Sequence, residues 1–292
     1  MDYQSLKYKY KTSSVVVKLI VINVAIFLAV WLGSFFLSQS QSVLTKWFAL
    51  PSDLKILILQ PWSIISYSFL HAGLSHILWN MLFLYWFGPM VLNLFNGKRF
   101  LTLYLLGALS GGLLFVSAYN IFPVFADSFT KTHLIGASAS VRAVMIFTAI
   151  FNPYAEMRFF FFKIKLWHIA LFVVAMDLIM IPISNAGGNI AHLGGALFGY
   201  LYATQLQKGK DIGLWWDKTM DLIIGLFKRK PNTPFKKVYK NPKRKSKQTN
   251  DSQNDTNNQE KINTILDKIS KSGYDSLTKA EKDFLFRASN NK

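Results

Sequence analysis

The sequence predicts an all-α membrane protein, in which a bundle of six transmembrane helices is followed by a small helical tail in the cytoplasm. Of the 292 residues, 51% are hydrophobic. Many of them fall in runs of about 20 residues, which is the length that crosses a bilayer as a helix. The basic residues lie between these runs and in the last third of the chain, as membrane topology requires.

The charge and the cysteine content exclude several classes of function. A net charge of +18 is compatible with nucleic-acid binding, but the positions of the basic residues favour a lipid bilayer as the partner and no nucleic acid. The chain has no cysteine, so it has no disulfide, no Cys-ligated metal and no thiol nucleophile. We expect no metal and no cofactor.

Six apolar runs are expected to span the membrane: 15–37, 75–95, 100–119, 136–152, 159–181 and 189–207. Lysines precede the first run, so the N-terminus and, after six spans, the C-terminus should be cytoplasmic. We expect a multi-pass protein of a bacterial-type plasma membrane. The first run is expected to be a retained span, because no small-residue cleavage site follows it. Residues 38–61 mix apolar and charged side chains, which is typical of an interfacial segment.

Four regions divide the chain. A cytoplasmic segment, 1–14, precedes the six-helix domain, 15–207. Residues 208–260 are expected to contain an amphipathic segment and a basic stretch held near anionic lipid. This region should end in a linker, Gln248 to Gln259, with too few apolar residues to fold. Residues 261–292 regain helical periodicity and predict a small helical hairpin.

Polar side chains inside the apolar runs are the candidate functional residues. Ser138 lies among small residues at the start of the fourth run, where a helix N-terminus favours developing negative charge. His76 and Asn80 share one face of the second span because they are four residues apart. His192 lies near the outer end of the sixth span. The alternating topology therefore places all four side chains at similar depth on the same side.

This set of side chains predicts nucleophilic catalysis. His192 can act as general base for Ser138. The side chains of Asn80 and His76 and the Ser138 backbone N–H can stabilise an oxyanion. We find no Asp or Glu suited to orient His192, so we expect a dyad rather than a triad. Two other interpretations remain open, namely structural contacts between helices and a polar pathway for an ion or small substrate.

Arg142 lies one turn below Ser138, inside a span, where an unpaired charge costs at least about 2.5 kcal/mol. Asp177 is the acidic residue at comparable depth in the fifth span. We therefore expect an Arg142–Asp177 ion pair between the fourth and fifth spans. The alternative is that both residues face internal water or backbone carbonyls.

Three motifs together resemble those of the rhomboid family of intramembrane serine proteases. The segment from His71 to Asn80 has the family's HxxxxHxxxN pattern, and Gly136-Ala137-Ser138 has the GxS pattern of the nucleophile. Ala191-His192-Leu193-Gly194-Gly195 has the AHxxG pattern of the helix that bears the base. The order and the topology also agree, over about residues 15–207.

The resemblance implies that Ser138 is the nucleophile, His192 the general base, and His76 and Asn80 the oxyanion partners. It also implies a membrane-embedded first loop. Supporting structural positions are His71, Gly136, Gly195 and Gly199. The implied activity is endopeptidase cleavage of transmembrane or juxtamembrane segments of membrane proteins, without a cofactor. The alternative is a non-catalytic rhomboid-like binder of membrane proteins or a small polytopic transporter; no oligomeric state is predicted.

Two positions depart from the family's pattern. Ala139 stands where the family usually has glycine directly after the nucleophile. Two alternatives stay open, namely that its methyl group crowds the substrate backbone and that this small residue is tolerated. Trp62-Ser63 stands where the family frequently has Trp-Arg. The contacts of that arginine should therefore be missing or replaced. Neither departure removes a catalytic group.

Overall fold

The computed structural model describes residues 2–128, 132–159, 162–227 and 252–290. Contacts between Cα atoms divide the chain into two compact units, Met1–Arg229 and Lys230–Lys292. The basic stretch expected at 228–247 lies outside the described residues.

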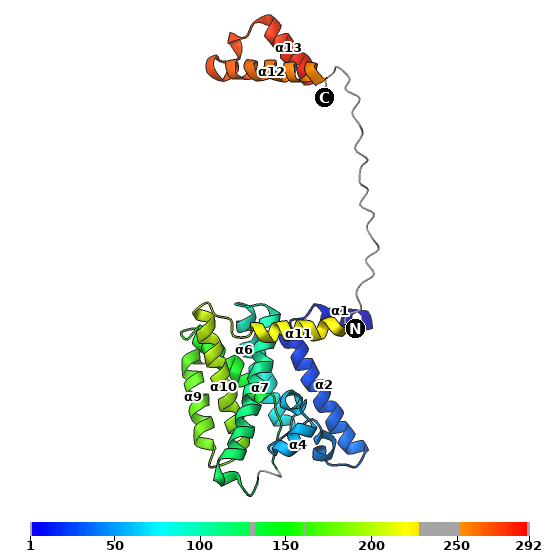
Figure 1. The fold of residues 1–292 in the computed structure, drawn as a ribbon, viewed down its shortest axis with the longest axis vertical. Helices are drawn as coiled ribbons and strands as arrows, with labels where there is room; N and C mark the ends of the chain where they lie inside the picture. The colour runs from blue at the N-terminus through cyan, green and yellow to red at the C-terminus, as the bar shows by residue number, and fades with distance from the viewer. Residues whose placement is uncertain (1, 129–131, 160–161, 228–251, 291–292) are drawn as a thin grey trace. The chain divides into compact units, whose positions relative to one another are not determined.

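The first unit is mostly helical, and its long helices pack side by side (Figure 1). They are α2 (Val15–Phe36), α6 (Leu74–Leu92), α7 (Gly97–Ile121), α8 (Ser138–Phe151), α9 (Leu166–Met180) and α10 (Ala186–Gln207). By length and composition, two helices of the described part, α2 and α7, could cross a membrane, whereas α8 and α9 are apolar but shorter.

Helix α8 is central to the packing, because it contacts α6, α7, α9 and α10. Two glycines of α10 allow its backbone to approach α8 closely. A Cβ on Gly195 would lie 2.0 Å from the carbonyl oxygen of Ala139, and one on Gly199 would lie 2.3 Å from that of Ala143. Since both neighbours are backbone atoms, the helices would have to separate to admit a side chain. This small-residue contact fixes the distance between α8 and α10.

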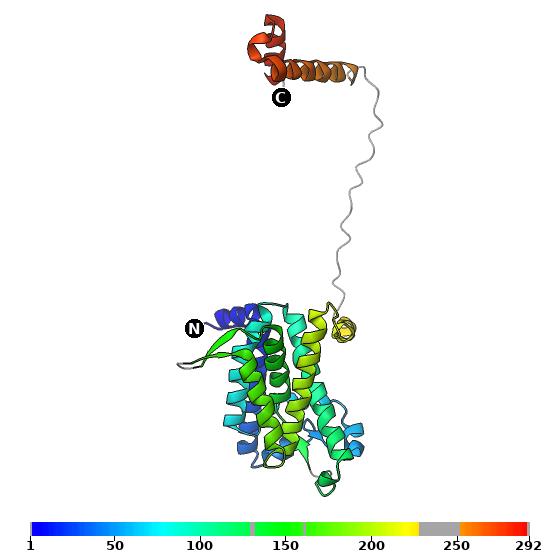
Figure 2. The same ribbon diagram turned by 90° about the vertical axis from the view of Figure 1, so that its left-hand side faces the viewer.

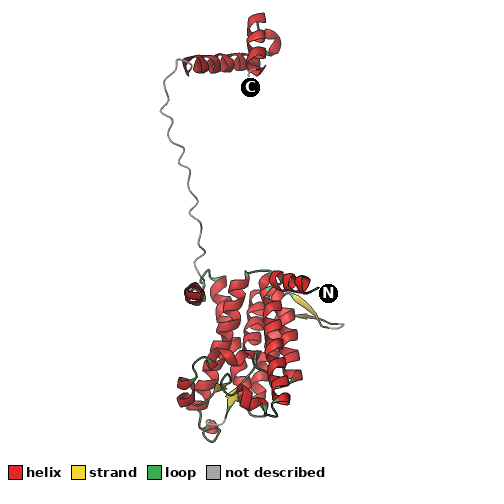
Figure 3. Ribbon diagram, turned by 90° about the vertical axis from the view of Figure 1, so that its right-hand side faces the viewer, coloured by secondary structure: helices red, strands yellow, loops and turns green. Residues whose placement is uncertain are grey.

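Two short strand pairs interrupt the helical fold, so the all-α expectation is wrong at these places (Figure 3). Strand β1 (Leu50–Pro51) pairs antiparallel with β2 (His133–Leu134), directly before α8. Strand β3 (Glu156–Phe159) pairs antiparallel with β4 (Phe162–Lys165), directly before α9.

The hairpin β3–β4 shortens the fifth expected span, which begins at Leu166 instead of residue 159. Charged side chains occupy every second position at both ends of this segment, which is the periodicity of a strand. Lys163 Nζ lies 3.7 Å from Glu156 Oε2 across the pair. The hairpin projects away from the packed helices (Figure 2). These charged side chains therefore lie outside α9.

Short helices make up most of the segment between α2 and α6. They are α3 (Gln41–Thr45), α4 (Leu54–Leu59), α5 (Ser63–Ser66) and the 3-10 turn η1 (Tyr67–Phe69). The indole N–H of Trp62 donates to the carbonyl oxygen of Trp47 at 2.7 Å. This bond joins the residue before α5 to the residues that follow α3, at the position where Ser63 stands in place of the arginine.

Helices α1 (Tyr3–Thr12) and α11 (Leu214–Phe227) lie across one end of the packed helices (Figure 1). Three aspartates tie the chain around α11 to the start of α7. Asp211 pairs with Arg99 at 2.8 Å and Asp221 with Lys98 at 2.6 Å, while Asp217 accepts from the Thr102 hydroxyl. These contacts explain why acidic residues occur in an otherwise apolar helix.

The second unit contains α12 (Ser252–Ser272), η3 (Tyr274–Ser276) and α13 (Lys279–Asn290). Helix α12 begins inside the stretch that we expected to be an unfolded linker, so that expectation is wrong from Ser252 onward. Once the apolar half of α12 is packed, extending the helix costs little, because Asn, Gln and Asp lie within about 0.7 kcal/mol of alanine in helix propensity.

Candidate active site

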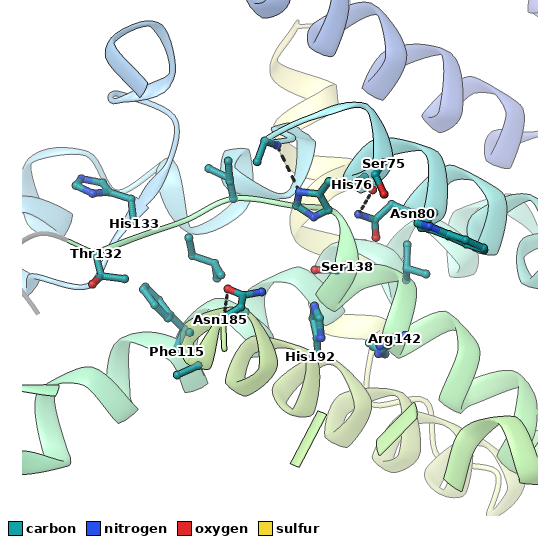
Figure 4. A pocket seen from close by; sticks show the side chains of 18 of the residues that line it. Ser75, His76, Asn80, Phe115, Thr132, His133, Ser138, Arg142, Asn185 and His192 are labelled. Carbon is teal, nitrogen blue, oxygen red and sulfur yellow. Dashed lines mark hydrogen bonds between the residues drawn. The ribbon is translucent and has the colours of Figure 1, made fainter. Parts of the chain in front are cut away.

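A cavity of about 630 Å³ is lined by the four side chains that the sequence singled out: Ser138, His76, Asn80 and His192 (Figure 4). They come from three helices, α8, α6 and α10. In the cavity, Ser138 lies between His76 on one side and His192 on the other. The structure thus brings together residues that are more than one hundred positions apart in the chain.

Gly136 shapes the approach to Ser138. Its φ is +131°, a conformation that L side chains rarely adopt, and its N–H donates to the carbonyl oxygen of Tyr67 at 3.0 Å. A Cβ at this position would lie 2.8 Å from His76 Nε2 and 3.4 Å from Ser138 Oγ. Glycine is therefore required both for the turn and for the space between these two atoms.

One ring nitrogen of His76 accepts a hydrogen bond from the backbone. The Ala72 N–H donates to its Nδ1 at 3.3 Å, so in the neutral ring the proton is on Nε2. That Nε2–H faces the space beside Gly136 and Ser138. His71, which is 4% exposed, packs edge-on to His76 with ring centroids 5.1 Å apart. A supporting role for His71 stays a prediction.

Asn80 is buried one turn after His76 on α6. Its amide nitrogen donates to the His76 carbonyl oxygen at 2.9 Å. An amide nitrogen carries two protons, so this bond fixes the side chain and leaves a second donor for the cavity.

His192 is hydrogen-bonded to a carboxylate, contrary to our expectation that no Asp or Glu would orient it. Its Nδ1 lies 2.8 Å from Asp177 Oδ1, and the two side chains are 15% and 4% exposed. A carboxylate can only accept, so His192 Nδ1 carries the proton and Nε2 is left as a base in the neutral ring. The expected dyad thus has a third member nearby.

The expected ion pair between Arg142 and Asp177 is also present. Arg142 Nε donates to Oδ2 at 2.8 Å and Nη2 donates to Oδ1 at 3.2 Å. The sequence predicted only the arginine as the partner of Asp177, although one carboxylate can accept hydrogen bonds from both Arg142 and His192. The sequence signal for the second contact is that Asp177 lies at the depth of His192 on a neighbouring span.

The Ala139 methyl group does not line the cavity. The side chain of Ala139 is 1% exposed and points to α7, where a Cβ on Gly111 would lie only 2.5 Å from the Ala139 methyl carbon. The extra methyl group is therefore accommodated by a glycine on the neighbouring helix.

Two family models match the chain. A model described as "Rhomboid domain" matches residues 59–208, which is just over half of the chain. The match starts after α2, whereas the motifs suggested a resemblance from residue 15 onward. A model described as a family of unknown function (DUF6576) matches residues 247–291, the part that contains α12 and α13.

Two curated relatives are similar over this region. The chain is 28% identical over 158 residues to RHOMBOID-like protein 12, mitochondrial, of Arabidopsis thaliana, an alignment that covers 51% of this chain and 47% of the relative. It is 27% identical over 204 residues to Rhomboid protein 1, mitochondrial, of Saccharomyces cerevisiae, covering 69% and 56%. The chain thus spans about half the length of these relatives.

Proposed function

This chain belongs to the rhomboid family, whose members are embedded in membranes, and we propose that it is a serine endopeptidase that cleaves membrane proteins in or beside their transmembrane segments. The observation that carries the proposal is the pair of histidine hydrogen bonds around Ser138. Ala72 leaves a donor on His76, and Asp177 leaves an acceptor on His192. A serine nucleophile needs both, one for the oxyanion and one for its own proton.

We further propose that α2 and α6–α10 cross the membrane, with both termini on the side where basic residues gather. Helix α8 has 14 residues and is therefore about 21 Å long, shorter than a hydrocarbon core of about 30 Å. Ser138 at its start then lies below one membrane surface, where the cavity supplies water. Both relatives are mitochondrial by name and do not favour a bacterial-type plasma membrane in particular.

In the first step of the proposed reaction, Ser138 Oγ attacks the carbonyl carbon of the scissile amide while its proton passes to His192 Nε2. The carbonyl oxygen becomes an oxyanion. The donors available to it are His76 Nε2–H, the second amide proton of Asn80 and the Ser138 backbone N–H. Removing one donor of this kind costs about 2.7–4 kcal/mol of transition-state stabilisation.

In the second step, the proton on His192 goes to the leaving amine as the C–N bond breaks, which leaves an acyl group on Ser138. Water then attacks the ester carbonyl while His192 takes a proton from it; the bond between Ser138 Oγ and the acyl carbon breaks, His192 returns the proton to Oγ, and the carboxylic product leaves. The substrate backbone must be unwound at the cleavage site, because a helical amide is already hydrogen-bonded within its own segment. No cofactor takes part in this scheme.

The test is cleavage of a single-span substrate in liposomes by the wild-type chain, Ser138→Ala and Ser140→Ala. Ser140 lies on the same helix but is fully buried and does not line the cavity, so its loss controls for general damage to α8. We expect Ser138→Ala to abolish cleavage and Ser140→Ala to retain it. Cleavage that survives Ser138→Ala would overturn the proposal; its absence in the wild-type chain would favour a non-catalytic membrane-protein binder.

A further inference from the structure

Asp177 is a buried carboxylate that contacts His192 without lining the cavity. It is 3% exposed. Its Oδ1 lies 2.8 Å from His192 Nδ1, and Arg142 donates to both of its oxygens. Three helices meet in this cluster, because Arg142 is on α8, Asp177 on α9 and His192 on α10.

We propose that Asp177 is a positioning residue for His192 and that Arg142 holds Asp177 in the required orientation. The inference rests on the proposed protease function and goes beyond it, because it adds two residues that do not touch the reacting atoms. The carboxylate keeps the proton of the neutral ring on Nδ1 and stabilises the imidazolium formed when His192 takes the Ser138 proton. The paired contacts from Arg142 restrict rotation of the carboxylate.

The geometry distinguishes this role from simple neutralisation of Arg142. A bidentate contact already satisfies an arginine–carboxylate pair, so the 2.8 Å contact to His192 is not needed for that purpose. The contact is made to the one ring nitrogen that must carry a proton if the other is to act as base. The charged and titratable groups facing His192 are Asp177 from α9, Arg142 from α8 and His76 from α6.

Asp211 offers a matched control at another place in the same unit. It also accepts from an arginine, with Arg99 Nη2 at 2.8 Å and Nε at 3.2 Å, but its other side-chain partner is the Tyr202 hydroxyl at 3.1 Å. Asp211→Asn therefore weakens an arginine–carboxylate pair with similar contact distances, although both Arg99 nitrogens donate to Oδ2 alone, and it does so without touching a histidine.

The experiment measures kcat and KM on a single-span substrate in liposomes. The variants are Asp177→Asn, Asp177→Asn/Arg142→Gln, Asp211→Asn and Ser138→Ala. In Asp177→Asn the amide N–H₂ can donate to Nδ1 and so favours the wrong tautomer of His192, which should lower kcat by about 10²- to 10⁴-fold. We expect KM to change by less than about twofold, because Asp177 does not touch the substrate.

The double variant decides between positioning and charge balance. It removes the negative and the positive charge together, so no unpaired arginine is left buried and folding is preserved. We expect its kcat to stay as low as that of Asp177→Asn, while Asp211→Asn keeps the wild-type value. Recovery of wild-type kcat in the double variant would overturn the inference and leave the protease assignment standing. Activity in Ser138→Ala would overturn both.

Discussion

Two aspartates of the first unit each accept two hydrogen bonds from one arginine, Asp177 through both carboxylate oxygens and Asp211 through Oδ2 alone. Asp177 accepts from Arg142 at 2.8 and 3.2 Å, and Asp211 accepts from Arg99 at the same two distances. The first pair is the more buried, with side-chain exposures of 17% and 4% against 31% and 11%. The first pair joins α8 to α9, and the second joins α7 to the connection between α10 and α11.

The third partner distinguishes the two clusters. For Asp177 it is His192, beside the cavity, and for Asp211 it is the hydroxyl of Tyr202. Both partners are on α10, roughly 15 Å apart along its axis. An imidazole exchanges a proton near neutral pH and a phenol does not. One kind of ion pair can therefore serve catalysis at one place and attach a helix at the other.

The largest expected effect is on catalysis when the two third partners are removed. His192→Ala should lower kcat by about 10⁴-fold or more, because Ser138 loses its base. Tyr202→Phe removes only a hydroxyl, so kcat should stay at the wild-type value and the free energy of unfolding should fall by about 1 kcal/mol. Liposome cleavage and denaturant unfolding in detergent measure the two quantities. Equal losses of kcat in His192→Ala and Tyr202→Phe would contradict a catalytic role for His192 and a structural role for Tyr202.

The next effect concerns stability and compares the two arginines. Arg142→Gln leaves a buried carboxylate with fewer donors and should lower the free energy of unfolding by about 3 kcal/mol. Arg99→Gln breaks a pair with more water access and should cost about 1 kcal/mol or less. It should also raise amide hydrogen exchange in α11, which the Asp211 contact holds. A larger loss of unfolding free energy in Arg99→Gln than in Arg142→Gln would contradict the expectation that the more buried pair contributes more to stability.

A third comparison uses glycines near each cluster. A Cβ on Gly195 would meet the Ala139 carbonyl oxygen, next to Ser138, whereas one on Gly213 would meet the side chains of Thr102 and Tyr202 at 2.8 Å. Gly195→Ala should separate α10 from α8 and lower kcat about 10²-fold, the cost of a misplacement of about 1 Å. Gly213→Ala should leave kcat unchanged and lower stability by about 1 kcal/mol. Kinetics and unfolding of both variants provide the test.

The smallest effect concerns a partly exposed carboxylate in the second unit, that of Glu281. The Thr278 backbone N–H, the Lys268 ammonium and the Thr278 hydroxyl lower the pKa of Glu281 from its ordinary 4.5 to about 2. The bonds from Thr278 form a capping box at the start of α13, and the Lys268 pair connects it to α12. Because the folded-state pKa is depressed, this stabilisation is present above pH 4.5 and is lost as the pH falls toward 2.

Amide protection factors of α13, measured by hydrogen exchange in the full chain, should therefore decrease between pH 4.5 and about 2. Glu281→Gln should lower protection already at the upper pH and flatten the response. The control is Glu260→Gln, which changes an exposed glutamate on α12. Its protection factors should respond to pH as those of the wild type do. An unchanged response in Glu281→Gln would show that the capping box does not stabilise α13.

Local patterns predicted much of the helical structure. Helix α2 begins at Val15 and α10 ends at Gln207, as the apolar runs indicated. The polar positions in these runs also indicated which side chains would meet, since the alternation of spans sets their depth. Depth alone, however, does not specify which way a side chain points around a helix axis.

The features that the sequence did not predict depend on the direction of a side chain around its helix axis, or on two local patterns that favour different secondary structures. Helix α9 is apolar on nearly all sides, so periodicity could not show that Asp177 faces both Arg142 and His192. The direction of the Ala139 methyl group depends on a glycine of α7, which no pattern in α8 reveals. At β3–β4, the aromatic residues extended an apolar run although the flanking charges alternated as in a strand.

The proposed reaction depends on Ser138 being a nucleophile that His192 activates. The most direct measurement is mass-spectrometric mapping of the adduct formed when the full chain in liposomes is treated with a serine-directed fluorophosphonate. We expect one adduct on Ser138 in the wild-type chain and in Ser140→Ala, and none on His192→Ala. An unmodified Ser138 in the wild-type chain, or equal labelling of Ser138 without His192, would contradict the claim.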